Sequence, residues 1–281
     1  MQNWGPEVDA AKTAALKAGE VVRRLYEAGT VRTWRKADES VVTEGDLASQ
    51  AAIVAVLAEK FPGDAVLSEE AADDPRRLGQ SRVWIIDPID GTRDFVERTG
   101  DFAIHVALAV DGSPTVGAVM LPATGALYFA AKGEGAFVVR GENETRLAVS
   151  RTSQLAEAQI GVSRFFESEP LKQLLSAAGL RNRAISMGAS TKAMAIAKGR
   201  LDVTVALNRD EKDWDTCAPE VIVCEAGGMV TDLGGAPLIY NRATVAHAHG
   251  SVMSNGQLHA QLVAHTQLFY SQSPVKRFVR S

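Results

Sequence analysis

Hydrophobic and small residues recur every three or four positions near the N-terminus, which is the spacing of one helix face. The stripe consists of Val8, Ala11, Ala15, Ala18, Val22 and Leu25. Because most of its members are small, this helix can approach another layer closely. A polar loop follows at residues 35–46 and leads into a second predicted helix over residues 47–61, with Asp46 as its N-cap.

The middle of the chain has the alternating pattern of β-strands. Both sets of alternating positions are largely non-polar at residues 102–110, which predicts a strand buried on both faces and places His105 in the core. Glycine-containing turns separate the neighbouring strands. Residues 83–149 are therefore expected to form a mostly antiparallel meander. Strands are predicted over residues 65–67, 83–86, 102–110, 115–121 and 127–131.

The second half alternates between strands and helices, which indicates an α/β layer. The strands are predicted over residues 159–163, 183–186, 201–207 and 251–254, and the helices over residues 169–178, 190–198, 214–226 and 255–266. We expect a boundary near Arg151. It divides the chain into an α+β subdomain, residues 1–150, and an α/β subdomain, residues 151–281, with the functional site where they meet.

Two aspartates interrupt the apolar run at residues 83–86. Asp87 and Asp90 have Pro88 between them and Gly91 behind, so the strand is expected to stop, and the glycine permits a positive φ or close approach to a ligand. Two carboxylates this close repel each other unless a cation lies between them, and Mg²⁺ is the hard cation that suits oxygen ligands. Thr92 would open a short helix whose free N–H groups attract an anion. The alternative is an ordinary Asp-Gly turn.

Composition narrows the class of protein. The 281 residues are 46% hydrophobic, and no apolar run reaches the length of about 20 residues that spans a bilayer. The net charge of −4 argues against a general nucleic-acid surface, so a nucleotide would bind locally through metals and a few cations. Cys217 and Cys224 lie on one predicted helix face and are expected in the core. Without a disulfide framework or a signal peptide, the cytoplasm is the expected compartment.

Two segments carry a resemblance to a known family. The segment DPIDGT at residues 87–92 resembles the first signature of the inositol monophosphatase superfamily of lithium-sensitive, Mg²⁺-dependent phosphomonoesterases. Trp214-Asp215, followed by an apolar helical run and EAGG at residues 225–228, resembles the second signature. The resemblance covers nearly the whole chain. It implies a layered α-β-α-β-α sandwich, two or three Mg²⁺ ions and inhibition by Li⁺.

The same resemblance assigns metal ligands and catalytic groups. Thr92 would orient the attacking water, Glu69 would help to accept its proton, and Asp90 would act beside them. Asp215 is also open to an ordinary capping role at a helix N-terminus. His247 and His249 are interpreted as loop residues, because soft ligands do not suit an oxygen site. The metal ligands implied are Glu69, Asp87, Asp90, Asp215 and the backbone carbonyl of Ile89, with Asp46 on a weaker third ion.

Three further segments resemble the bisphosphate-nucleotidase branch of the family. They are the loop at residues 35–46, interpreted as a flap over the metals, GASTK at residues 188–192 and PLIYN at residues 237–241. Where that branch has Ser-His, this chain has Phe165 and Phe166, and the Phe166 ring offers a stacking face for a base. The substrate-binding residues implied are Lys36, Gly91, Thr92, Ser163, Arg164, Phe166, Gly188, Ser190, Lys192 and Asp215.

These features predict hydrolysis of adenosine 3',5'-bisphosphate to AMP and phosphate. Inositol monophosphatase or fructose-1,6-bisphosphatase activity from the same site is the nearest alternative. A metal-binding regulatory protein without turnover is an alternative of another class. The expected partner is a small-molecule phosphate ester, with no nucleic-acid polymer and no membrane. A homodimer is compatible with the sequence, which leaves the oligomeric state open.

Overall fold

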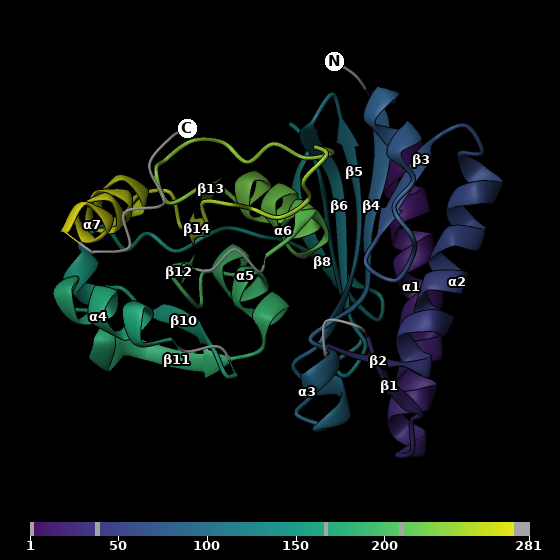
Figure 1. Ribbon diagram of the computed structural model, residues 1–281, viewed down its shortest axis with the longest axis horizontal. Helices are drawn as coiled ribbons and strands as arrows, with labels where there is room; N and C mark the ends of the chain where they lie inside the picture. Colours follow the sequence, from purple (N-terminus) through teal and green to yellow (C-terminus); the bar gives the residue numbers. More distant parts are fainter. Residues whose placement is uncertain (1–2, 37–39, 166–167, 208–210, 273–281) are drawn as a thin grey trace.

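The computed structural model describes residues 3–36, 40–165, 168–207 and 211–272, and leaves the side chains of residues 189, 190 and 270 undescribed. Its helices and sheets alternate in five layers (Figure 1). One sheet is covered on its outer face by two long helices, two further helices lie between the sheets, and two more cover the second sheet. The layered α-β-α-β-α sandwich is thereby confirmed.

The outer helix pair consists of α1 (Gly5–Ala28) and α2 (Glu44–Lys60). The predicted small stripe of α1 is buried, and a Cβ added at Gly19 would lie 2.8 Å from the Met120 side chain, so the helix presses directly on the sheet. The prediction that Asp46 caps α2 is wrong. Thr43 is the N-cap, and Asp46 stands at the third helical position, where the two residues form a reciprocal capping box.

The first sheet has seven strands in the order β3-β4-β5-β6-β7-β8-β9. β3 and β4 are parallel and every later pair is antiparallel, which confirms the meander. The strands are β3 (Ala65–Ser68), β4 (Arg82–Asp90), β5 (Ala103–Val110), β6 (Ser113–Leu121), β7 (Ala126–Ala131), β8 (Gly135–Arg140) and β9 (Asn143–Arg146).

The predicted stop of the strand at Asp87 is wrong, because β4 continues to Asp90. Its pairing with β5 shifts register between Asp87 and Asp90, and this irregularity accommodates Pro88, which has no N–H for a ladder. In a regular strand, residues three apart point to opposite faces. The register shift instead allows both carboxylates to lie on the same side.

The second sheet has five strands in the order β11-β10-β12-β14-β13. β10 is parallel to β11 and β12, whereas β14 is antiparallel to β12 and β13. β13 was not predicted from the sequence, because its three residues are too few to show a pattern. The strands are β10 (Ile160–Ser163), β11 (Ala184–Met187), β12 (Val203–Ala206), β13 (Met229–Thr231) and β14 (Ser251–Ser254). The expected boundary at residue 150 lies between β9 and β10.

The helices of the second half divide between two layers. α5 (Ala189–Ala197) and α6 (Asp213–Glu225) lie between the sheets, and α4 (Glu169–Ala177) and α7 (His259–Gln272) cover the outer face of the second sheet. α6 packs against β4, β5 and β6 of the first sheet, so a helix from the second half reaches the two aspartates of β4. Cys217 is buried in this layer as predicted, but Cys224 is exposed, so its predicted burial is wrong.

Short elements complete the chain. They include the ribbon of β1 (Thr33–Arg35) and β2 (Val41–Thr43) within the predicted flap, and α3 (Thr92–Val96) directly after the aspartates. The described residues also form short 3₁₀ helices, which are η1 (Pro75–Gly79), η2 (Leu155–Glu157) and η3 (Arg181–Arg183). Across the described ranges, every helix is too short or too polar to span a bilayer.

Candidate active site

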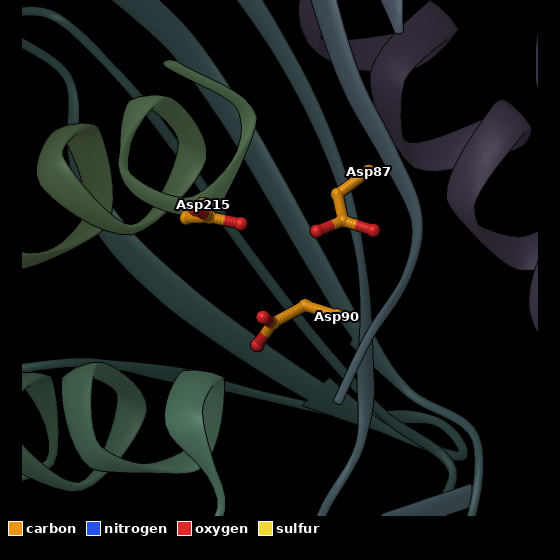
Figure 2. A group of neighbouring side chains, drawn as sticks. All are labelled: Asp87, Asp90 and Asp215. Atoms are coloured by element: carbon orange, nitrogen blue, oxygen red, sulfur yellow. The ribbon is translucent and has the colours of Figure 1, made fainter. Parts of the chain in front are cut away.

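Three aspartates from both halves of the chain meet at one point. Asp87 and Asp90 come from the end of β4, and Asp215 comes from the first turn of α6. One carboxylate oxygen from each lies within 4.8 Å of those of the other two. Figure 2 shows the carboxylates of Asp87 and Asp215 pointing toward each other, with the carboxylate of Asp90 below and between them. The structure thus brings together three of the residues that the sequence nominated as metal ligands.

The carboxylates of this cluster are buried close to one another, which makes their charged forms costly. Asp87 is 1% exposed, and neither of its oxygens has a hydrogen-bond partner among the described residues. Burial raises the pKa of Asp87 well above its usual value, and the charges of Glu69, Asp90 and Asp215 raise it further. Burial and the charge of Asp90 likewise raise the pKa of Asp215. Buried like charges are costly, and an all-oxygen donor set of this kind fits Mg²⁺.

Asp215 has the capping role that the sequence allowed, while its role as a metal ligand stays a prediction. Its Oδ2 accepts a 2.7 Å hydrogen bond from the backbone N–H of Lys212, which is the capping role. The residue nevertheless belongs to the cluster of close carboxylates with Asp87 and Asp90. Capping fixes the side chain at the start of α6, and a fixed side chain is what a metal ligand requires.

Glu69 lies next to this cluster rather than within it. Its carboxylate is 3.2 Å from Lys36 Nζ, and the same ammonium is 2.5 Å from Glu70. Lys36 comes from the end of β1, so these ion pairs tie the flap ribbon to the turn after β3. The charge of Glu69 still acts on Asp87. Its role as a metal ligand, and that of Lys36 toward substrate, stay predictions.

Thr92 is held by a contact that the sequence did not reveal. Its hydroxyl lies 3.2 Å from Asp46 Oδ1 and 3.1 Å from the carbonyl oxygen of Ile89. Asp46 is fully buried, and its Oδ2 accepts from the N–H and hydroxyl of Thr43 at 2.7 and 2.6 Å. Burial raises the pKa of Asp46. Asp46 therefore orients Thr92, while its binding of a third ion and the Ile89 carbonyl's binding of a metal stay predictions.

A buried lysine and a serine lie within reach of the charge of Asp90. Lys192 is 8% exposed, and its Nζ lies 2.5 Å from Ser163 Oγ at the end of β10. Burial lowers the pKa of Lys192, and the charges of Glu211 and Asp90 oppose that shift. A Cβ added at Gly161 would lie 3.0 Å from Lys192 Cγ, so this glycine makes room for the lysine stem. Lys192 is thus an enclosed cation that the charge of Asp90 reaches, rather than a solvated surface residue.

Arg164 and Gly188 join the two halves beside α3. The guanidinium of Arg164 pairs with Asp94 at 2.6 Å and with Asp101. The N–H of Gly188 donates to Asp101 Oδ2 at 3.3 Å, and a Cβ at Gly188 would lie only 2.1 Å from the Asp101 carbonyl oxygen. Both residues were predicted to bind substrate, but in this structure their observed partners are protein carboxylates. Gly91 has the positive φ that the sequence allowed, at +85°.

Two of the predicted substrate residues fall on parts of the chain outside the described residues. Phe166 lies outside the described residues, and so does the side chain of Ser190. Beside the first of these positions, the Arg93 guanidinium lies 4.0 Å from the centroid of the Phe165 ring. Stacking of a base on Phe166 therefore stays a prediction.

Two histidines pack against the start of α6. His105 Nδ1 lies 3.0 Å from the Trp214 carbonyl oxygen, and burial lowers the pKa of His105 to about 4, so its predicted place in the core is confirmed. His247 lies in a loop, as predicted, but it is buried. It is 2% exposed, with Nε2 2.7 Å from Thr216 Oγ1. The sequence did not reveal this contact, because 31 residues separate the partners.

Comparison with known proteins agrees with this geometry. The model of the inositol monophosphatase family matches residues 5–269. The 3'(2'),5'-bisphosphate nucleotidase CysQ of Aggregatibacter actinomycetemcomitans is 32% identical over 231 residues, which are 81% of this chain and 85% of that protein. The histidinol-phosphatase of Mycobacterium tuberculosis is 34% identical over 267 residues, which are 90% of this chain and 95% of that protein.

Solved structures show the same relationship. The IMPase of Thermotoga maritima superimposes with a TM-score of 0.79 and 29% identity, covering 95% of this chain and 98% of that one. CysQ from Bacteroides thetaiotaomicron, described as a bacterial member of the inositol monophosphatase family, gives 0.75 and 29%, covering 88% and 96%. With a family match over nearly its whole length and the aspartate cluster in place, the chain belongs to the inositol monophosphatase family of phosphatases.

Proposed function

We propose that this protein is a Mg²⁺-dependent 3'(2'),5'-bisphosphate nucleotidase that hydrolyses adenosine 3',5'-bisphosphate to AMP and phosphate. The observation that carries the proposal is a pairing of opposite features. The carboxylate of Asp87, whose oxygens have no hydrogen-bond partner among the described residues, lies in the aspartate cluster, and the enclosed cation of Lys192 lies within reach of the charge of Asp90. A substrate with two phosphates satisfies both, because one phosphate binds at the metals and the other meets the ammonium.

Asp87, Asp90 and Asp215 would hold the metal, with Glu69 and the Ile89 carbonyl completing the set that the family resemblance implies. Enzymes of this family depend on Mg²⁺. These residues would hold Mg²⁺, which when bound would supply a lowered pKa for a water molecule and positive charge to offset that of the phosphate ester.

Thr92 and Glu69 would handle the attacking water. The Thr92 hydroxyl has a single proton, which it donates to Asp46 or to the Ile89 carbonyl. Its oxygen lone pairs therefore remain to accept a hydrogen bond from the water and to orient it. The Glu69 carboxylate, 27% exposed at its side chain, would accept the proton that the water releases.

Lys192 would favour a bisphosphate over a monophosphate. An ammonium on a flexible stem is a compact point charge that suits a phosphate without demanding one geometry. Its observed hydrogen-bond partner is the neutral hydroxyl of Ser163, which is also able to donate to a phosphate oxygen. The CysQ relatives at 30–32% identity support the same substrate.

Histidinol phosphate is the second candidate substrate. Two histidinol-phosphatases are 32% and 34% identical to this chain and cover 92% and 90% of it, more than the 81% covered by the first CysQ relative. This substrate carries an amine, which the negative charge of Glu211 that acts on Lys192 would also attract. A histidinol-phosphatase would have no second phosphate for Lys192 to bind.

The test is a substrate panel with released phosphate measured in Mg²⁺. The panel contains adenosine 3',5'-bisphosphate, histidinol phosphate, inositol 1-phosphate and fructose 1,6-bisphosphate, each with and without a chelator. We expect the nucleotide to have the highest kcat/KM, chelation to abolish turnover, and millimolar Li⁺ to inhibit it. A higher kcat/KM for another ester would transfer the assignment to that ester. No turnover of any ester would favour the regulatory alternative.

A further inference from the structure

The loop at residues 239–247 lies along the start of α6. Backbone hydrogen bonds of 2.9 Å join Asp213 N–H to the Val245 carbonyl and His247 N–H to the Glu211 carbonyl. Lys212 and Ala246 form an antiparallel bridge between these bonds. The loop therefore holds the three residues from which the first turn of α6 begins, and Asp215 belongs to that turn.

Asn241 anchors this loop in two directions. Its backbone N–H donates to Asp213 Oδ2 at 2.8 Å. Its side chain forms a reciprocal pair with Arg77, in which Oδ1 accepts from Nη1 at 2.8 Å and Nδ2 donates to the Arg77 carbonyl at 3.0 Å. Asn241 has φ +58°, a conformation that asparagine tolerates better than most residues. The segment PLIYN thus contains a structural link between the two halves.

In the first half of the chain, this link is formed by Arg77. It lies in η1 and is 1% exposed, which is rare for an arginine. Its Nε and Nη2 bind both oxygens of Asp73, and its Nη1 also donates to the Arg242 carbonyl at 3.0 Å. The rigid guanidinium fork therefore connects the segment before β4 to the loop that supports α6.

This link spans the two halves that supply the aspartates. Asp87 and Asp90 belong to β4, which follows η1, whereas Asp215 belongs to α6. The position of Asp215 relative to the other two depends on how α6 is held against the first sheet. The hydrogen bonds from Arg77 through Asn241 to Asp213 end two residues before Asp215.

We propose that Arg77 is a positioning residue, which sets Asp215 against Asp87 and Asp90 through Asn241 and thereby raises the affinity of the site for Mg²⁺. The inference rests on the metal site of the proposed function, but not on which phosphate ester is the substrate. Residues that orient metal ligands without touching the metal commonly change metal affinity by about 10–100-fold.

The test is calorimetric titration of metal-free protein with Mg²⁺, alongside thermal unfolding. Arg77→Lys keeps the charge and loses the fork, and the adjacent Arg76→Lys is the matched control, because Arg76 is exposed and pairs with Asp74 at the surface. We expect Arg77→Lys to raise the Kd for Mg²⁺ about tenfold or more. Arg76→Lys should leave the Kd unchanged.

A second variant keeps the test valid if Arg77→Lys folds poorly. Asn241→Gly tolerates the positive φ and keeps the N–H that binds Asp213, but removes both side-chain bonds to Arg77. It should also raise the Kd. Wild-type Kd values in both variants, even with a lowered Tm, would overturn the inference and leave the proposed function intact. Wild-type protein that binds no Mg²⁺ would overturn both. Binding of Mg²⁺ without nucleotide hydrolysis would overturn the proposed function alone.

Discussion

The two sides of the site differ in how their charges are balanced. On the β4 side, both oxygens of Asp87 are buried without a hydrogen-bond partner among the described residues. On the β10 side, the Arg164 guanidinium is paired with Asp94 and Asp101. In the function proposed above, a ligand would bind at the unbalanced charge of Asp87, whereas the balanced charge of Arg164 joins the two halves. The sequence predicted that Arg164 binds substrate, but its observed ion pairs connect the two halves of the chain.

Lys192 combines features of both sides. It is a buried cation, but its hydrogen-bond partner is the neutral hydroxyl of Ser163 rather than a carboxylate. Burial lowers the pKa of Lys192 because it makes the charged form costly, and the charges of Glu211 and Asp90 offset only part of that cost. We therefore expect Lys192 to contact the substrate and Arg164 to hold the two halves together.

The largest effect is expected from Asp90 on the unbalanced side. Asp90→Asn keeps the shape of the turn but removes one charge of the cluster, so turnover in Mg²⁺ should fall by at least about a hundredfold while the protein still folds. Phosphate release and circular dichroism measure the two properties. Asp74→Asn, which alters a surface ion pair, is the control. Wild-type turnover in Asp90→Asn would exclude the aspartate cluster as the active site.

A smaller and more selective effect is expected from Lys192. Lys192→Met keeps the buried stem and removes the charge, so kcat/KM for adenosine 3',5'-bisphosphate should fall about tenfold or more, as for a lost charged hydrogen bond. Inositol 1-phosphate, with no second phosphate, should be much less affected. Lys198→Met, in the residue after α5, is the matched control. Equal losses for both substrates would place Lys192 with the structural groups.

The smallest effect concerns pH and Glu220, which is buried in α6. Burial raises the pKa of Glu220 from 4.5 to about 7, although the hydrogen bond from Tyr240 opposes the shift. The folded protein then holds this proton more tightly than the unfolded chain does. The contribution of Glu220 to stability is therefore complete below about pH 4.5 and is lost as the pH rises toward 7.

Glu220→Gln should accordingly reduce the fall in Tm between these pH values, while activity changes little. The measurement is Tm of metal-free protein across the range, with the exposed Glu157→Gln as control. Part of the fall should remain in Glu220→Gln, because the pKa values of Asp87 and Asp215 are raised in the same direction. If Tm fell with pH equally in Glu220→Gln and in the wild type, the Glu220 carboxyl would bind its proton equally well in the folded and unfolded states.

Much of the fold follows from local periodicity. The stripe of α1 and the alternation of β5 are repeated often enough to be read without tertiary information. β13 is too short for a period, and the continuation of β4 past Pro88 depends on its pairing with β5. Pairing between strands is a tertiary property, so a local rule about proline gave the wrong end for β4.

The site divides in the same way. Asp87 and Asp90 were predictable because both belong to the six consecutive residues 87–92, which form a recognisable motif. The contact of Asp46 with Thr92 joins residues 46 apart, and that of Arg77 with Asn241 joins residues 164 apart. Neither contact leaves a local pattern. The substrate assignment of Arg164 came from a resembling segment, and its carboxylate partners come from elements distant in the sequence.

Thermal unfolding with and without Mg²⁺ tests most directly the claim that Asp87 is buried for the sake of a metal. Asp87→Asn should raise the Tm of metal-free protein, because it removes a buried charge that Glu69, Asp90 and Asp215 repel, and should nearly abolish the response to Mg²⁺. Asp94→Asn, which weakens a balanced pair, should lower the Tm and keep that response.

For the wild type, Mg²⁺ at about 100 times its Kd should stabilise the fold by about 2.7 kcal/mol, or roughly 5–10 °C in Tm. Two results together would contradict the claim that Asp87 is buried to bind a metal. They are a wild-type Tm that does not change with Mg²⁺, and an Asp87→Asn protein that is less stable than the wild type without metal.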